Sequence, residues 1–302
     1  MQINRRNFLK AAGASALLLS SFRTWAALSG GAPLPAIGLQ TYTLGPLLTA
    51  EDADVPAVLQ ELARIGIKEL ETATGNGGLY YGYKPAEFKK MVDDTGMVWI
   101  GNHVGGLPRA TAGSSQSSRR VSSRANLRDN MSEIMDGSVE GGCKWVVCAS
   151  SAVSTLDEIK ATAELFAAAG EQARNRGMKF AYHNHQSEFD EVSGTSAYEY
   201  VLNNTSSDEV FMEIDLAWAV SAGMDPLEMF RQYPKRFPLW HVKDVDKATG
   251  RPCPVGEGRV DFKRIFTGAE AAGLTHMFIE QDRANGTSDV QTSVSWMAKN
   301  IS

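Results

Sequence analysis

Cysteine is scarce in this chain of 302 residues, which has three, an odd number without metal-ligand spacing. The sequence therefore excludes the disulfide framework that holds many small secreted domains together. Cys143 and Cys148 stand at the two ends of one apolar run, CKWVVC, where a bridge between neighbours on a strand is geometrically unfavourable. We expect both to be buried thiols.

Basic residues are fewer than acidic ones. The chain has 30 Lys and Arg against 35 Asp and Glu, a net charge of −5 and a pI near 5.6. A surface of this sign does not attract a polyanion, so nucleic acid is not an expected partner. No G-x-G-x-x-G sequence opens a helix after the first apolar run, which leaves a dinucleotide site without support.

The apolar run near the N-terminus, Ala11–Leu19, is too short to span a bilayer stably. Arg5 and Arg6 precede it, and small residues follow it over Ala26–Ser29. This order is typical of a twin-arginine export signal. We therefore assign residues 1–30 to a signal peptide and 31–302 to one folded domain. We expect a periplasmic protein with no membrane span once it is mature.

Eight short apolar runs alternate with longer segments of helical pattern in the rest of the chain. Helical patterns cover residues 55–66, 85–96, 155–177 and 261–273, and each ends in a glycine. Eight β-then-α units in about 270 residues predict an α/β fold, a single (β/α)8 TIM barrel, with a doubly wound open sheet as the alternative. The runs begin at Ala36, Lys68, Met97, Cys143, Lys179, Val210, Phe237 and His276.

Ionisable residues gather at the C-terminal ends of these runs, where the active sites of barrels form. Side chains alternate along a strand, so residues two apart share a direction. We expect each such pair to point into the barrel mouth if one of its members does. His276, at the start of its run, is expected to be structural. The pairs are His183 with His185, Glu213 with Asp215, and His241 with Lys243.

The fifth to the eighth runs each bring a histidine or a carboxylate to the same level. These residues are His183, Asp215, His241 and Glu280. Two imidazoles and two carboxylates suit a six-coordinate divalent ion, Mn²⁺ above all, with two positions left for substrate oxygens. Mg²⁺, Co²⁺, Fe²⁺ and Zn²⁺ remain alternatives, as does a polar network without a metal.

Six motifs follow the signal: IGLQTYT, YHNHQSEF, MEIDLAW, LWHVKDVD, VGEGRVDF and FIEQD. Together they resemble the xylose isomerase-like TIM barrels of the sugar (phosphate) isomerase/epimerase superfamily. The likeness is greatest to the exported branch near the inosose dehydratases and the members that act on keto-sugars. It covers essentially the whole chain after the signal. The motifs are specific to the superfamily and not to a substrate.

The resemblance places metal ligands on Asp215, His241 and Glu280. The fourth ligand, usually a glutamate on the fifth strand, falls on His183. A histidine there leaves Glu280 as the one glutamate of the set, and His183 is either an imidazole ligand or a general base. His185 corresponds to the catalytic histidine of related members that eliminate from keto-sugars, and its ordinary pKa near 6.5 suits proton abstraction near neutral pH.

The other candidate residues surround this set. Lys243 is expected either to support a developing oxyanion or to form a salt bridge with Asp244 or Asp246. The catalytic candidates are thus His185, Glu280, His183 and Lys243. Glu213 is a candidate for orienting a metal ligand. Substrate contacts are expected from His103, Glu71, Gln40 and Glu257.

The resemblance implies a metal-dependent isomerase or epimerase of a free sugar, polyol or keto-sugar, acting by proton abstraction through a metal-stabilised enediolate. The alternative is a lyase or hydratase that eliminates from a keto-sugar or keto-glycoside, and the histidine at position 183 favours it. Two further classes have less support: a metal-dependent endonuclease and a non-catalytic carbohydrate-binding protein. We expect a small carbohydrate as substrate, and the oligomeric state stays open, with a dimer or tetramer compatible with the sequence.

Overall fold

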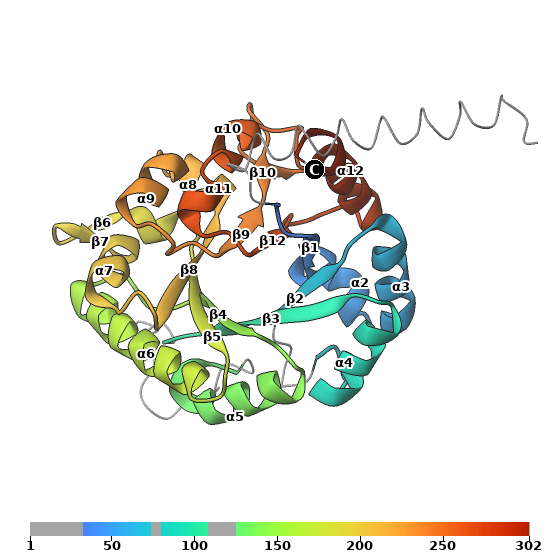
Figure 1. Cartoon of the computed structure of the whole chain (residues 1–302), viewed down its shortest axis with the longest axis horizontal. Coiled ribbons are helices and arrows are strands. Elements are labelled where there is room, and N and C mark those ends of the chain that lie inside the picture. Colours follow the sequence, from blue (N-terminus) through green and yellow to red (C-terminus); the bar gives the residue numbers. More distant parts are fainter. Residues whose placement is uncertain (1–32, 74–79, 108–124, 302) are drawn as a thin grey trace, which may run out of the picture.

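Eight parallel strands close into a barrel, and helices surround it (Figure 1). The computed structural model describes residues 33–73, 80–107 and 125–301. Around the barrel the strands follow in the order β1, β2, β3, β4, β5, β8, β9 and β12, and β12 pairs with β1 to complete the ring. The predicted (β/α)8 barrel is therefore confirmed.

Each barrel strand begins inside one of the eight predicted runs, so the alternation of runs and helical segments located all of them. Four short strands lie outside the barrel and form two antiparallel pairs: β6 (Glu191–Val192) with β7 (Thr195–Ser196), and β10 (Asp244–Val245) with β11 (Pro252–Cys253). The barrel strands are β1 (Ile37–Gln40), β2 (Glu69–Ala73), β3 (Val98–Gly105), β4 (Trp145–Ser150), β5 (Lys179–His183), β8 (Val210–Asp215), β9 (Leu239–Val242) and β12 (His276–Ile279).

The helices lie outside the ring of strands (Figure 1). The α-helices are α2 (Gly45–Thr49), α3 (Val55–Ile65), α4 (Pro85–Asp94), α5 (Leu127–Glu140), α6 (Leu156–Arg174), α7 (Ala197–Asn204), α8 (Leu216–Ser221), α9 (Pro226–Gln232), α10 (Phe262–Phe266), α11 (Ala269–Ala272) and α12 (Thr287–Asn300). Two 3₁₀ helices follow strand ends, η1 (Thr41–Leu44) and η2 (Ser187–Phe189).

Local sequence sets where these helices begin and end. Asp54 caps α3 by accepting the main-chain N–H of Ala57 at 3.0 Å, and Gly66 ends the helix with a left-handed φ of 113°. The predicted helix over residues 261–273 is instead two short ones, α10 and α11. A Cβ at Gly268, between them, would stand 2.5 Å from Leu227 of α9, so close packing against α9 accompanies the break.

Apolar side chains fill the barrel interior at the end opposite the strand C-termini. Trp145, Leu239 and Phe278 are buried there, and the ring of Phe211 packs edge-on to Trp145 with centroids 5.4 Å apart. Gly38 leaves the room that Phe278 occupies, since a Cβ at position 38 would lie 2.5 Å from its ring. The interior is therefore closed by packing at this end and polar at the other.

Three further expectations concern the chain as a whole. The cysteines are free, and Cys143 and Cys148 are buried as predicted, while Cys253 is partly exposed. Among the described residues, no helix is long and apolar enough to cross a membrane. The predicted signal, residues 1–30, lies outside the described ranges.

Asp244 holds the loop that follows β9. Its buried carboxylate accepts the main-chain N–H groups of Val245, Gly256, Gly258 and Val260 at 2.9–3.1 Å. A Cβ at residue 258 would stand 2.1 Å from Asp244 Oδ1, so this close approach requires glycine. The two glycines of the VGEG motif thus both donate their main-chain N–H groups to one carboxylate.

Replacing Asp244 with alanine should lower the free energy of unfolding by about 3 kcal/mol, because four main-chain N–H groups lose their acceptor. Urea unfolding followed by circular dichroism measures this change. Asp246→Ala is the matched control: Asp246 is partly exposed, its carboxylate closes only its own turn, at Ala248 and Thr249, and the loss there should stay below about 1 kcal/mol. Equal losses in the two variants would contradict the role given to Asp244.

Candidate metal and substrate site

Four barrel strands bring two histidines and two carboxylates together at the barrel mouth. His183 ends β5, Asp215 ends β8, His241 lies in β9, and Glu280 directly follows β12. One nitrogen or carboxylate oxygen from each lies within 4.8 Å of the others, and all four residues are buried. The predicted convergence is confirmed. We call these four residues the mouth set.

Asp215 presents one oxygen to the mouth and uses the other for the fold. Oδ1 caps α8 by accepting the main-chain N–H of Trp218 at 3.0 Å. Oδ2 is buried and makes no hydrogen bond in the described part of the chain. Burial raises the pKa of this carboxyl to about 6, although Lys243 opposes the rise. A buried carboxylate oxygen without a partner is suited to a cation.

The mouth set also includes a neutral imidazole. Burial and the nearby rings of His241 and His185 lower the pKa of His183 well below its usual value. A neutral ring keeps a lone pair, which a metal ligand requires. Its ring centroid lies 4.5 Å from that of His241. The donor set therefore fits a divalent ion.

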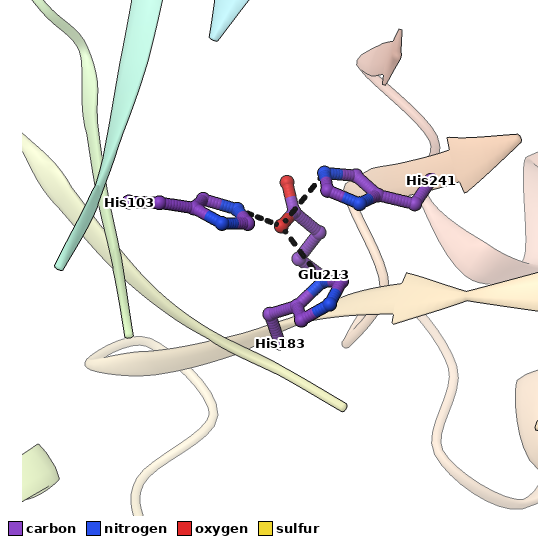
Figure 2. A group of neighbouring side chains, drawn as sticks. All are labelled: His103, His183, Glu213 and His241. Atoms are coloured by element: carbon purple, nitrogen blue, oxygen red, sulfur yellow. Dashed lines mark hydrogen bonds and ion pairs between the residues drawn. The ribbon is translucent and has the colours of Figure 1, made fainter. Parts of the chain in front are cut away.

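A second group of ionisable side chains is gathered around the carboxylate of Glu213 (Figure 2). Glu213 Oε2 is 2.6 Å from His103 Nε2, 3.2 Å from His183 Nδ1 and 3.2 Å from His241 Nε2. Glu71 Oε2 lies 2.9 Å from His103 Nε2 and 2.8 Å from His241 Nε2. We call His103, His183, Glu213 and His241 the inner set, with Glu71 beside it.

His241 connects the two sets through opposite edges of its ring. Nδ1 faces Glu280 Oε2 at 2.9 Å, and Nε2 faces Glu71 Oε2 at 2.8 Å. Burial alone would lower the pKa of His241, but the carboxylates of Glu213 and Glu280 outweigh it and raise the pKa well above its usual value. With Nε2–H donating to Glu71, an ion in the mouth set can replace the proton on Nδ1.

Two other pKa values reflect the crowding of carboxylates around these rings. Burial alone would lower the pKa of His103, but Glu71 and Glu213 raise it to about 9. Burial, together with the charge of Glu71, raises the pKa of Glu213 to about 7. The predicted shared direction of Glu213 and Asp215 is confirmed, since both contact groups inside the barrel.

Lys243 extends its ammonium group into the mouth. Nζ lies 3.1 Å from Glu280 Oε2 and 3.7 Å from Asp215 Oδ2, and it also contacts Asp282. It stands 4.9 Å from the centre of the Trp218 ring. The expected alternative, a salt bridge to Asp244 or Asp246, is not among the contacts of the described residues. The lysine instead neutralises part of the charge of the mouth set.

A cavity of about 480 Å³ opens above the mouth set. His183, His185 and Glu280 line it, and Asp282 and Tyr42 stand at its wall. The predicted shared direction of His183 and His185 is thus confirmed, with ring centroids 5.0 Å apart. The His185 side chain is 47% exposed, whereas that of His183 is buried, so His185 is the more accessible to a substrate.

The sequence analysis did not identify two residues that position the main chain of Asp215 and His185. Asn184 is buried between the two histidines and accepts the main-chain N–H of Asp215 at 3.0 Å. Glu188 is buried as well, accepts the main-chain N–H of His185 at 2.9 Å, and has Oε1 4.0 Å from His185 Nδ1. The YHNHQSEF motif contained both, but no spacing rule separates such side chains from ordinary loop residues.

The predicted substrate contacts fall in different places. His103 lines the cavity. Gln40 and Glu71 are fully buried below it, where Gln40 Nε2 donates to Glu71 Oε2 at 2.7 Å. Glu257 is exposed on the loop held by Asp244 and is not among the residues that line the cavity. Substrate contact by these residues stays a prediction.

Comparison with known proteins agrees with this geometry. The family described as Xylose isomerase-like TIM barrel matches residues 59–300. The chain belongs to this family. A solved structure described as a sugar phosphate isomerase/epimerase from Parabacteroides distasonis has 28% identity to this chain and a TM-score of 0.72, and the match covers 88% of this chain and 95% of that one.

Two other likenesses within the xylose isomerase-like family are more limited. Inosose dehydratases from Lacticaseibacillus casei and Clostridium perfringens are 29% and 26% identical over 135 and 146 residues. These matches cover 38% and 43% of this chain, which spans about half the length of those relatives, 45% and 48%. The IOLI protein, whose structure holds a zinc atom, has a TM-score of 0.66 at 14% identity over 88% of this chain and 98% of that one, which shows the fold alone.

Proposed function

We propose that this chain is a divalent-metal-dependent enzyme of a small carbohydrate that removes a proton from the carbon beside a carbonyl group, and that elimination follows. The proposal rests above all on one observation: two members of the mouth set, His183 and Glu280, line a cavity that also exposes an imidazole, His185. An ion held by the mouth set would polarise the carbonyl and make the neighbouring C–H acidic.

His185 is the best-placed base among the described residues of the cavity. Glu280 is paired with His241 and Lys243, and Asp282 is paired with Lys243. Among the described residues, the ion-pair partner of His185 is Glu188, whose Oε1 lies 4.0 Å from Nδ1, and the His185 ring is open to the cavity. It would take the proton, and Lys243 would support the negative charge that develops on the carbonyl oxygen.

Elimination is favoured over epimerisation because an epimerase needs a second acid on the opposite face of the carbon. The mouth set has one glutamate, and three carboxylates of this region, those of Asp215, Glu280 and Asp282, are paired with Lys243. After proton loss, the electron pair of the C–H bond would form a carbon–carbon double bond, and the group on the next carbon would leave as water or an alcohol after taking up a proton. The inosose dehydratases are dehydratases by name, which agrees with this choice.

Epimerisation is the second candidate, since the Parabacteroides distasonis relative is described as an isomerase/epimerase. Incubating the Mn²⁺-loaded protein with keto-sugars and keto-glycosides in D₂O, followed by NMR, separates the two reactions. We expect an unsaturated product with loss of water or alcohol. A stereoisomer of unchanged composition carrying deuterium at one carbon would favour epimerisation, and the absence of any exchange or product across the panel would contradict both. Protein stripped of metal by a chelator is the control.

A further inference from the structure

We propose that the inner set is a second cation site, selective for Zn²⁺, which overlaps the mouth set and cannot be filled together with it. This inference does not depend on the proposed reaction, because it concerns metal binding alone. It rests on the donor atoms around Glu213, which come from β3, β5, β8 and β9 (Figure 2).

The spacing of the donor atoms matches a zinc coordination sphere. Bonds of about 2.0–2.1 Å in a tetrahedron set neighbouring donors about 3.3 Å apart. Glu213 Oε2 lies 3.2 Å from His183 Nδ1 and 3.2 Å from His241 Nε2, and 2.6 Å from His103 Nε2. The first two distances fit as they stand, and the third requires His103 to withdraw by several tenths of an ångström. The ligand atoms of all four residues lie within 4.8 Å of one another, so modest shifts of the rings around Glu213 Oε2 would bring one carboxylate oxygen and three imidazole nitrogens to a common ion.

Two buried atoms of this group have no hydrogen-bond partner among the described residues. His183 Nδ1 faces Glu213 but makes no hydrogen bond, and its side chain is 2% exposed. Glu213 Oε1 is buried and unpaired as well. A network that existed only to exchange hydrogen bonds would be expected to satisfy such atoms. An ion bound to the lone pair of His183 Nδ1 would give that nitrogen the partner it lacks.

Ligand type separates the two sites. The inner set offers three imidazoles and one carboxylate, with Glu71 as a further oxygen, while the mouth set offers two of each kind. Zn²⁺ accepts nitrogen-rich four-coordinate sites, whereas Mn²⁺ prefers oxygen ligands and higher coordination. We therefore assign Zn²⁺ to the inner set and Mn²⁺ to the mouth set.

The two sites share His183 and His241, which excludes filling both at once. His241 presents Nδ1 to the mouth and Nε2 to the inner set. An imidazole that binds an ion through one nitrogen normally keeps a proton on the other, which here would stand in the ligand sphere of the second ion. Zn²⁺ in the inner set would therefore weaken Mn²⁺ binding at the mouth.

Binding measurements on two matched variants test this inference. His103→Gln removes a donor that belongs only to the inner set, and Asp215→Asn removes one that belongs only to the mouth set. Metal-free protein is titrated with ZnCl₂ and separately with MnCl₂ by calorimetry. We expect His103→Gln to weaken Zn²⁺ at least tenfold while Mn²⁺ changes far less, and Asp215→Asn to do the reverse. Circular dichroism checks that both variants are folded.

A second variant and a spectrum keep the test decisive. Glu213→Gln should weaken Zn²⁺ as His103→Gln does, and Co²⁺ in the wild type should show the intense visible absorption of a four-coordinate site, which both variants lose. If Zn²⁺ affinity follows Asp215 and ignores His103, Zn²⁺ lies in the mouth set and the inference is overturned. That result would leave the proposed function intact. If Mn²⁺ affinity did not depend on Asp215, both the assignment of Mn²⁺ to the mouth set and the proposed function would be contradicted, whereas the assignment of Zn²⁺ to the inner set would stand.

Discussion

Asp215→Asn is expected to lose its bound divalent ion and to lower kcat/KM by about 10³-fold or more, about 4 kcal/mol of transition-state stabilisation. The substitution keeps Oδ1, which accepts the Trp218 N–H and begins α8. It replaces Oδ2, the oxygen without a hydrogen-bond partner in the described chain, by an amide NH₂ group that cannot bind a cation. The change therefore separates metal binding from folding.

Elemental analysis of the purified variant and its turnover measure the two effects. A melting experiment adds a third readout: Mn²⁺ at about 100 times its Kd should stabilise the wild type by about 2.7 kcal/mol and the variant hardly at all. Asp225→Asn is the matched control, since Asp225 caps α9 through Leu227 N in the same way but pairs with Arg264 on the surface. It should keep both metal and turnover. An Asp215→Asn protein that retained its metal would refute the place given to this oxygen.

The second large effect is expected from His185→Gln, which should retain the ion and lower turnover by about 10²–10⁴-fold. His185 lines the cavity, with a side chain 47% exposed, and it does not belong to the mouth set. Glutamine fills similar space but cannot take a proton. The loss should therefore appear in kcat, with the metal content unchanged.

Deuterium exchange at the carbon beside the carbonyl, measured by NMR, reports the proton-removal step directly. Gln186→Ala is the matched control because Gln186 is exposed in the same loop and is not among the residues that line the cavity. Its exchange rate should equal that of the wild type. Normal exchange by the His185→Gln protein would remove His185 from the reaction.

Much of this arrangement could be predicted from strand periodicity alone. The alternation of side chains placed His183, Asp215 and His241 on the inside of the barrel, and the count of eight runs placed them on neighbouring strands. Both predictions needed only local patterns. The resemblance added the ligand assignment, including the histidine where the family usually has a glutamate.

Contacts across the barrel could not be predicted in this way. Glu213 meets His103, 110 positions away, and Glu71 meets His241, 170 positions away. Which charges face each other depends on the level that each strand reaches, and β2 and β3 carry a register shift that no sequence pattern signals. The same holds for Glu257, whose loop follows a course fixed by main-chain bonds to Asp244.

The packed end of the barrel, opposite the strand C-termini, has a consequence for how substrate enters and product leaves the cavity. That side is filled by the side chains of Trp145, Phe211, Leu239 and Phe278. In the described part of the chain, a substrate that enters the cavity at the C-terminal ends of the strands must therefore leave, as product, on the same side. Substrate and product then enter and leave on one side of the barrel, and a rising product concentration should slow substrate binding by competitive inhibition.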